Sequence, residues 1–233
     1  DEARLLYDKM YFCLIMKMMK NRIIKKEGEP MNWKKAWEHF QTITYHKKLV
    51  RQYCFRVGLY RQGLLHDLSK FSPTEFLVGM KYFQGDRSPN NAEREAKGYS
   101  SSWLHHKGRN KHHFEYWLDY TLESDHIIGG MKMPVPIVVE MFMDRIAACR
   151  TYQKDAYTDA SPWEYHKRSR RVNVLMHPET VQLLERMLKM LAECGEDATF
   201  AYVRHILRKD RWNRFCTFCK RNRPKRMKHK PYR

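Results

Sequence analysis

The spacing of apolar residues along the chain predicts helices. In residues 1–26 apolar side chains recur three and four positions apart, which is the period of one helical face. They are Leu5, Leu6, Phe12, Ile15, Met16, Met19 and Ile23. We expect this helix to end in a basic turn before Gly28 and Pro30 and to bury its apolar face against the rest of the chain.

A second helix is expected to begin at Asn32, a good capping residue, and to continue to about Gly58. His46 lies within it, and its predicted buried stripe is Trp33, Trp37, Phe40, Thr44, Leu49 and Tyr53. A short third helix over 59–68 ends at the sequence His66-Asp67-Leu68-Ser69-Lys70. Ser72-Pro73-Thr74-Glu75 is then typical of the start of the next helix. The His-Asp pair therefore lies at a helix end.

Residues 85–102 are rich in Gly, Ser, Pro and Asn, which predicts a long exposed loop. Further helices are expected over 116–122, 137–152, 178–193 and 198–208, with a break at 129–136 and a cap at Gly195. The sequence shows neither an alternating strand pattern nor an internal repeat. The predicted fold class is therefore all-α, with one core.

Composition supports a folded, cytoplasmic protein. Of the 233 residues, 42% are hydrophobic and 30% are charged, so disorder throughout is excluded. No uncharged run approaches the roughly 20 residues that cross a bilayer, and no signal-peptide layout is present. Six scattered cysteines are typical of reduced thiols, and only Cys216 and Cys219 are close in sequence. A zinc site there would need His205 or His229 to complete it.

The formal charge of +19 is concentrated near the end of the chain. Twelve Lys or Arg and one Asp lie between Arg208 and Arg233. Such a run is commonly solvated and disordered. Its functional interpretation is contact with nucleic-acid phosphates, which the interleaved Trp212, Phe215 and Phe218 favour. The N-terminal helix similarly has two interpretations: core packing, or an amphipathic helix on an anionic membrane surface.

Histidine and carboxylate are ligands for first-row transition metals, and here they recur in order as His46, His66-Asp67, two histidine pairs and Asp144. This order resembles the HD-domain superfamily of metal-dependent phosphohydrolases. The resemblance lies in Tyr45-His46, in Leu64-Leu65-His66-Asp67-Leu68-Ser69-Lys70-Phe71 and in Met143-Asp144-Arg145. It covers roughly residues 33–155. The stretch from Leu104-His105-His106 to His112-His113-Phe114-Glu115-Tyr116-Trp117 is more similar to an uncharacterised bacterial family that we associate with the same superfamily.

The resemblance implies an HD-domain-like helical bundle, to which we assign residues 31–208. The apolar spacing adds a helix over 1–30 that packs on the bundle, and the run of charges adds a basic tail over 209–233. The resemblance also implies a divalent transition metal (Mn, Fe, Co, Ni or Zn), as one or two ions. The implied ligands are His46, His66, Asp67 and Asp144, with His105, His106 and His112 as further candidates. The simpler interpretation of Arg145 is a structural role, as the partner of Glu140 in a salt bridge.

The two histidine pairs leave the choice of ligand open. Each member of His105-His106 is seven residues from its counterpart in His112-His113, which would give one helical face if Gly108 did not interrupt the helix. Adjacent helical residues point about 100° apart, so we expect one member of each pair to face inward. The alternative is a cationic surface cluster. The resemblance connects these extra histidines with a second metal.

The function that the resemblance implies is a phosphohydrolase in which a metal-bound hydroxide attacks a nucleotide or other phosphate ester, with the pKa of water lowered to roughly 7. Asp67 would hold the water, Lys70 would face the phosphorylated small-molecule substrate, and Arg109 would add an anion contact from the loop. The alternatives are a di-iron oxygenase on the same scaffold and a nucleic-acid-binding protein with a structural metal site.

Overall fold

The computed structural model describes residues 2–23, 32–122, 127–169 and 174–221. Its fold is all-α, as the hydrophobic spacing predicts. The helices, with 3-10 helices marked η, are α1 (Glu2–Ile23), α2 (Trp33–Arg56), α3 (Tyr60–Leu65), η1 (Leu68–Phe71), α4 (Pro73–Tyr82), α5 (Pro89–Lys97), α6 (Ser101–Lys107), η2 (Phe114–Trp117), α7 (Val135–Gln153), η3 (Lys154–Ala156), α8 (Ser161–Arg168) and α10 (Pro178–Arg221). Within the described ranges one antiparallel pair of strands forms, β1 (Leu118–Tyr120) and β2 (Ile128–Gly130).

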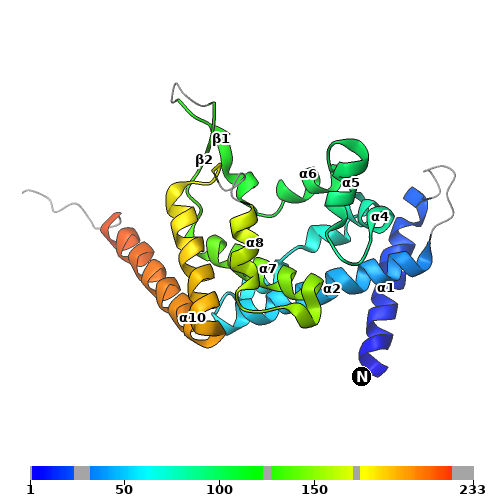
Figure 1. Cartoon of the computed structure of the whole chain (residues 1–233), viewed down its shortest axis with the longest axis horizontal. Helices are drawn as coiled ribbons and strands as arrows, with labels where there is room; N and C mark the ends of the chain where they lie inside the picture. The colour runs from blue at the N-terminus through cyan, green and yellow to red at the C-terminus, as the bar shows by residue number, and fades with distance from the viewer. Residues whose placement is uncertain (1, 24–31, 123–126, 170–173, 222–233) are drawn as a thin grey trace, which may run out of the picture.

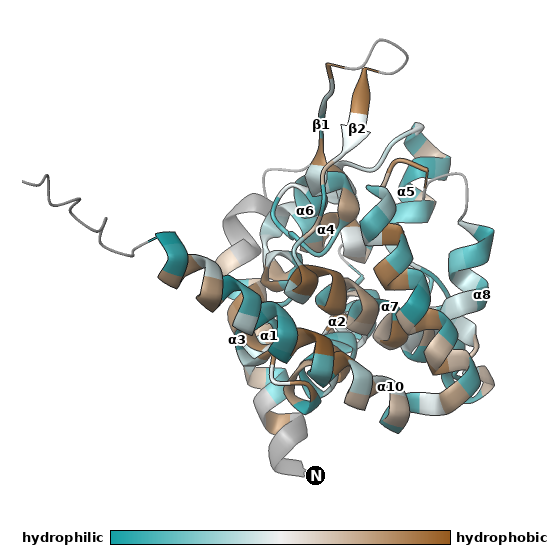
Figure 2. Ribbon diagram, turned by 90° about the vertical axis from the view of Figure 1, so that its left-hand side faces the viewer, coloured by the Kyte–Doolittle hydropathy of each residue, from teal (hydrophilic) through white to brown (hydrophobic). Residues whose placement is uncertain are grey.

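Helices α2 and α7 pack against each other at the centre of the molecule, and α10 covers α7 (Figure 1). The first residue of α2 follows Asn32, whose side chain accepts a hydrogen bond from the backbone N–H of Lys35, so the predicted cap is confirmed. In Figure 2, α7 carries many hydrophobic residues, whereas α5 is largely hydrophilic. The face of α2 that carries Phe40 and Val50 is buried, but Trp33, which we expected on that stripe, is 57% exposed.

Buried apolar side chains form two clusters, although the sequence predicted one core. The larger lies between α2, α7 and α10 and includes Val50, Phe142 and Phe200. The smaller joins α1, α2 and α4, and in it the rings of Phe12 and Phe40 lie 5.3 Å apart. Helix α2 contributes to both clusters, and His46 lies on it between the two contributions.

Two segments differ from the elements predicted for them. Helix α5 forms inside the predicted loop 85–102, and a 3-10 turn followed by β1 replaces the helix predicted over 116–122. Helix α5 is polar, so periodicity could not reveal it. Its buried Glu93 accepts hydrogen bonds from the hydroxyls of Ser100 and Ser101, which ties α5 to the start of α6. The short helix α8 was not predicted, and the basic turn expected around Gly28 lies outside the described residues.

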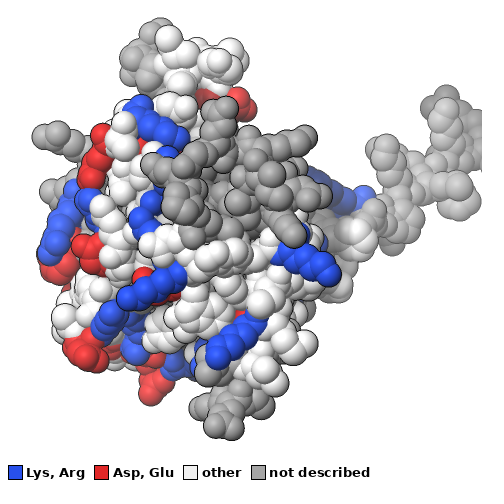
Figure 3. Space-filling model, turned by 90° about the vertical axis from the view of Figure 1, so that its right-hand side faces the viewer, with Lys and Arg blue, Asp and Glu red and all other residues white. Residues whose placement is uncertain are grey.

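Helix α10 is interrupted at Gly195, whose φ of 74° is readily adopted only by glycine, so the predicted end there is confirmed. Beyond it the helix continues to Arg221 and does not end near 208. Residues 209–221 of the predicted basic tail are therefore helical, while 222–233 lie outside the described part. Trp212, Phe215 and Phe218 on this extension are exposed. On the opposite side of the molecule, Figure 3 shows Lys and Arg scattered over the surface, several of them beside Asp or Glu.

Candidate metal centre

The His66-Asp67 pair forms the corner between α3 and η1. Asp67 has φ 53° and ψ 27°, a left-handed conformation that costs a residue with a Cβ roughly 1–2 kcal/mol. Lys47 of α2 holds this corner, because its ammonium donates to the carbonyl oxygens of Leu64 and His66 at 2.8 and 2.6 Å. Both His66 and Asp67 are 2% exposed, so the strained turn directs them into the interior.

Four of the predicted ligands meet at this corner. His46 comes from α2 and Asp144 from α7, and their Nε2 and Oδ1 atoms lie 2.9 Å apart. Nε2 of His66 lies 3.4 Å from Asp67 Oδ2 and 3.5 Å from Asp144 Oδ1. One ligand atom from each of the four lies within 4.8 Å of the others, a separation that allows a single ion to contact all of them.

A second group of potential ligands uses the other oxygen of Asp67. Oδ1 lies 3.3 Å from Nε2 of His106 and 3.3 Å from Nε2 of His112, and His113 completes the group. Asp67 therefore presents one carboxylate oxygen to each group, which is the arrangement of a carboxylate that bridges two ions.

The structure resolves the ambiguity of the histidine pairs. Helix α6 ends at Lys107 with Gly108 as its cap, so the helix is interrupted where expected. His106 is 2% exposed and joins the second group, whereas His105 is only half-buried and belongs to none of the groups found in the described residues. His112 and His113 both join, contrary to the expectation of one per pair. They can both face the site because their segment is not helical.

Two buried carboxylates orient the histidines. Oε1 of Glu140 lies 3.0 Å from Nδ1 of His66 and 3.3 Å from Nδ1 of His112. Glu75 of α4 accepts from Nδ1 of His106 at 2.7 Å with one oxygen and contacts His105 at 2.6 Å with the other. A histidine that donates from Nδ1 keeps a lone pair on Nε2, the form that binds a metal. Neither Glu75 nor Glu140 was predicted as part of the site.

The close approach of α4 to α2 positions Glu75. A Cβ on Gly79 would collide with the ring of the buried His39, so only glycine permits this contact between the two helices. Glu75 lies four residues earlier on the same helix, on the face turned toward the cluster. The spacing of Glu140 and Asp144 gives the same relationship on α7.

Several buried nitrogen and oxygen atoms of the two ligand groups are suited to binding a cation. Nε2 of His46, His66, His112 and His113 and Oδ1 of Asp67 are buried and have no hydrogen-bond partner of acceptable geometry in the described part of the chain, while Oδ2 of Asp67 is in ion-pair contact with Lys70. Buried polar atoms without partners cost roughly 1–3 kcal/mol each, so several in one place call for a ligand. Imidazole nitrogen with carboxylate oxygen is the donor set of Zn, Fe, Mn, Co and Ni.

The electrostatics of the cluster also favour positive charge. Burial lowers the pKa of His66, but Asp67, Asp144 and Glu140 outweigh it and raise that pKa to about 10. Burial raises the pKa of Asp144, yet the nearby imidazoles of His46 and His66 outweigh burial and hold that pKa well below its usual range. The carboxylates therefore stay ionised and attract a cation.

A cavity of about 780 Å³ opens onto both groups and is lined by His46, His106, His113 and Asp144. Lys70 also lines it, with its ammonium 2.6 Å from Asp67 Oδ2. Arg109, predicted to contact substrate, is exposed and donates to the carbonyl oxygen of His105, away from the residues that line the cavity.

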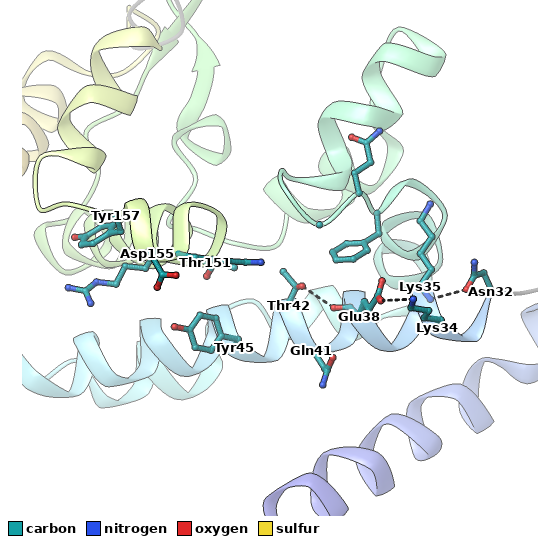
Figure 4. Close-up of a pocket in the computed structure, with 15 residues that line it drawn as sticks. Asn32, Lys34, Lys35, Glu38, Gln41, Thr42, Tyr45, Thr151, Asp155 and Tyr157 are labelled. Carbon is teal, nitrogen blue, oxygen red and sulfur yellow. Dashed lines mark hydrogen bonds and ion pairs between the residues drawn. The ribbon is translucent and has the colours of Figure 1, made fainter. Parts of the chain in front are cut away.

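A second, more open cavity of about 970 Å³ lies between α2, the end of α4 and the end of α7 and contains none of the potential ligands (Figure 4). It extends from Asn32 and Lys34 to Tyr157, and Thr42 lines both cavities. Among the described residues, no group of potential metal ligands lies along it, so we regard it as a surface groove.

Arg145 and the pair Cys216 and Cys219 lie outside the groups of potential ligands. Arg145 does not pair with Glu140; its guanidinium donates to His166 instead. Cys216 and Cys219 have free thiols, and no group of three or more potential ligands includes them in the described residues, while His229 lies outside that part. In the same ranges no helix is long and apolar enough to cross a membrane.

Fold and site together define an all-α protein with a buried cluster of histidine and carboxylate side chains suited to metal binding. The chain belongs to a family of unknown function, DUF5662, whose model matches residues 35–190. That segment contains every residue of the candidate metal centre. No curated protein and no solved structure matches the chain.

Proposed function

We propose that this chain is a metal-dependent phosphohydrolase related to the HD-domain superfamily, with two cation sites that share Asp67. The observation that carries the proposal is the division of the Asp67 carboxylate, with Oδ2 toward His66 and Oδ1 toward His106 and His112. The two groups would hold one divalent transition-metal ion each. Bound there, such ions supply Lewis acidity and a water whose pKa is lowered to roughly 7.

The residues of the cavity would bind and orient a phosphate ester. Lys70 is a cation on the cavity wall and is ion-paired with Asp67. Metal ions bound to Asp67 would compensate the charge of that carboxylate. The Lys70 ammonium would then be available to bind a phosphate oxygen. Charge that grows on the phosphoryl oxygens is stabilised most by cations already in position. Trp103, Phe114 and Tyr152 line the same space and limit the access of water.

Hydrolysis tests the proposal. The protein, reconstituted separately with Mn, Fe, Co, Ni or Zn, would be assayed on p-nitrophenyl phosphate and bis-p-nitrophenyl phosphate. Asp67→Asn should lose both metal and turnover, and Lys70→Ala should keep metal but lose turnover by about a hundredfold. The exposed Asp119→Asn is the matched control. Unchanged turnover in Asp67→Asn contradicts the proposal. Two bound irons with oxygen uptake on a polyol or phosphonate, and no ester hydrolysis, would instead identify the oxygenase.

Nucleic acid is a second candidate partner, and the end of α10 favours it. Trp212 and Phe215 are 64% and 56% exposed, with ring centroids 6.0 Å apart, on a helical segment rich in Lys and Arg. Aromatic rings beside cations stack on bases while the cations contact phosphates. Binding to single-stranded oligonucleotides should fall steeply with salt and weaken in Trp212→Ala, while metal content stays unchanged. Equal binding by the variant contradicts this role.

A cytoplasmic location belongs to the same proposal. All six cysteines are free, as expected in a reducing compartment.

A further inference from the structure

Arg145 is a second cation, besides Lys70, that lies close to the candidate metal ligands in this cavity. It follows Asp144 directly on α7, is half-buried, and lines the same cavity of about 780 Å³ as Lys70. Its side chain therefore enters the space into which a ligand of the metal centre would fit.

A chain of two hydrogen bonds fixes the Arg145 guanidinium. Its Nη1 lies 2.8 Å from Nδ1 of His166, and Nε2 of His166 lies 3.2 Å from Oε1 of Glu185. Arginine can only donate, so Nδ1 of His166 must accept and its proton must be on Nε2, directed at Glu185. His166 is 1% exposed, and its ring stacks on Trp163 at 5.7 Å with an interplanar angle of 23°.

Arg145 differs from the other arginines that line this cavity. The guanidinium of Arg87 donates to both oxygens of Glu95 at 2.8 Å, and Arg94 donates to Asn91 and lies over the ring of Trp103. In the described ranges Arg145 has no ion pair with a carboxylate, and its hydrogen-bond partner is a neutral imidazole.

A cation held rigidly in a cavity, with no carboxylate in ion-pair contact among the described residues, can bind an anion, because its charge is partly desolvated and the nearby carboxylates of Asp144 and Glu115 form no ion pair with it. The guanidinium fork matches the planar pairs of oxygens on phosphate and carboxylate groups. Among the described residues, His166 accepts from one of the five N–H groups of the Arg145 guanidinium, which leaves others available to a ligand.

We infer that Arg145 is the anion-recognition residue of this cavity, with His166 and Glu185 as positioning residues, and that its ligand carries a phosphate or carboxylate group. The identification of that ligand as a substrate rests on the proposed function. The anion site itself does not.

Calorimetric titration with inorganic phosphate tests the site. The full chain would be measured as purified and again after treatment with a chelator, beside Arg145→Gln and the exposed control Arg61→Gln. Phosphate affinity should fall by about tenfold or more in Arg145→Gln, in both states, and stay unchanged in the control. Affinity that survives in Arg145→Gln, or is absent from the chelated wild type, overturns the inference, because the anion would then bind to metal alone.

Two substitutions of His166 separate positioning from packing. His166→Asn keeps an acceptor near the place of Nδ1 but loses the ring, whereas His166→Phe keeps the ring on Trp163 but loses the acceptor. If His166 positions Arg145, phosphate affinity is retained in His166→Asn and reduced in His166→Phe. The reverse order contradicts the positioning role. Phosphate binding that depends on Arg145 in a protein that hydrolyses no ester would uphold the anion site and reject the phosphohydrolase.

Discussion

Oδ1 of Asp67 lies 3.3 Å from Nε2 of His112, a residue 45 positions further along the chain, in a segment without regular helix. The other oxygen of the same carboxylate faces His66 at 3.4 Å. This single side chain therefore connects two groups of potential ligands. Metal binding should therefore depend on Asp67 and on Glu75 and Glu140, the carboxylates that orient the histidines.

Glu140→Gln should weaken metal binding without unfolding the protein. Glu140 accepts from Nδ1 of His66 and lies 3.3 Å from Nδ1 of His112, so an amide in its place supplies one acceptor oxygen and no charge for two imidazoles. Loss of such a supporting partner typically reduces metal affinity by about 10–100-fold. Titration with Co²⁺ or Zn²⁺ measures the change, and Glu38→Gln, on the outer side of α2, is the control. Wild-type affinity in Glu140→Gln would show that the carboxylate does not orient the ligands.

Glu75→Gln should affect only one of two ions. Glu75 supports His106, which belongs to the second group, and has no contact with the ligands of the first group among the described residues. We expect one equivalent of metal to remain tightly bound and the other to weaken by about tenfold. His106→Ala should lose that equivalent, and His105→Ala should retain both. Equal weakening of both ions in Glu75→Gln would argue against two separable sites.

Part of this site could be predicted from the sequence. The four residues of the first group lie on, or at the end of, helices that periodicity reveals, and their order along the chain carries the resemblance that implied them as ligands. The residues of the second group were harder to predict from the sequence. His105 and His106 differ only in which side of one short helix they occupy, and His113 enters the site because residues 111–113 leave the helical period. Glu75 and Glu140 read as ordinary helical acids, since the histidines that they contact are distant in sequence.

Side-chain contacts also explain why helix α5 was not predicted from the sequence. Helix α5 owes its order to Glu93 and the serines at the start of α6, contacts that hydrophobic periodicity does not register. It begins with Pro89-Asn90-Asn91 and is flanked by Gly85, Ser88 and Gly98, a composition that is typical of a loop.

Glu93 should make stability depend on pH in the acid range. Burial raises its pKa, but hydrogen bonds from Ser101, Ser100 and the Ser102 N–H outweigh burial and lower the pKa from 4.5 to about 2. The folded state therefore favours the ionised form. The resulting stabilisation is fully present above pH 4.5 and is lost as the pH falls toward 2.

Glu93→Gln should reduce the free energy of unfolding by about 1–3 kcal/mol at neutral pH. The difference from wild type should shrink between pH 6 and pH 3, as urea denaturation at each pH would show. Glu95→Gln, on the exposed side of the same helix, is the control. A difference that is constant across this range would mean that Glu93 is not preferentially ionised in the folded state.

Elemental analysis of the purified protein, beside His66→Ala and the control His105→Ala, tests the central claim most directly. We predict up to two equivalents of a divalent transition metal in the wild type and in His105→Ala, and loss of the first-group ion in His66→Ala with weakening of its neighbour. Absence of metal from the wild type, even after reconstitution with Mn, Fe, Co, Ni and Zn, would contradict the existence of a metal centre at Asp67.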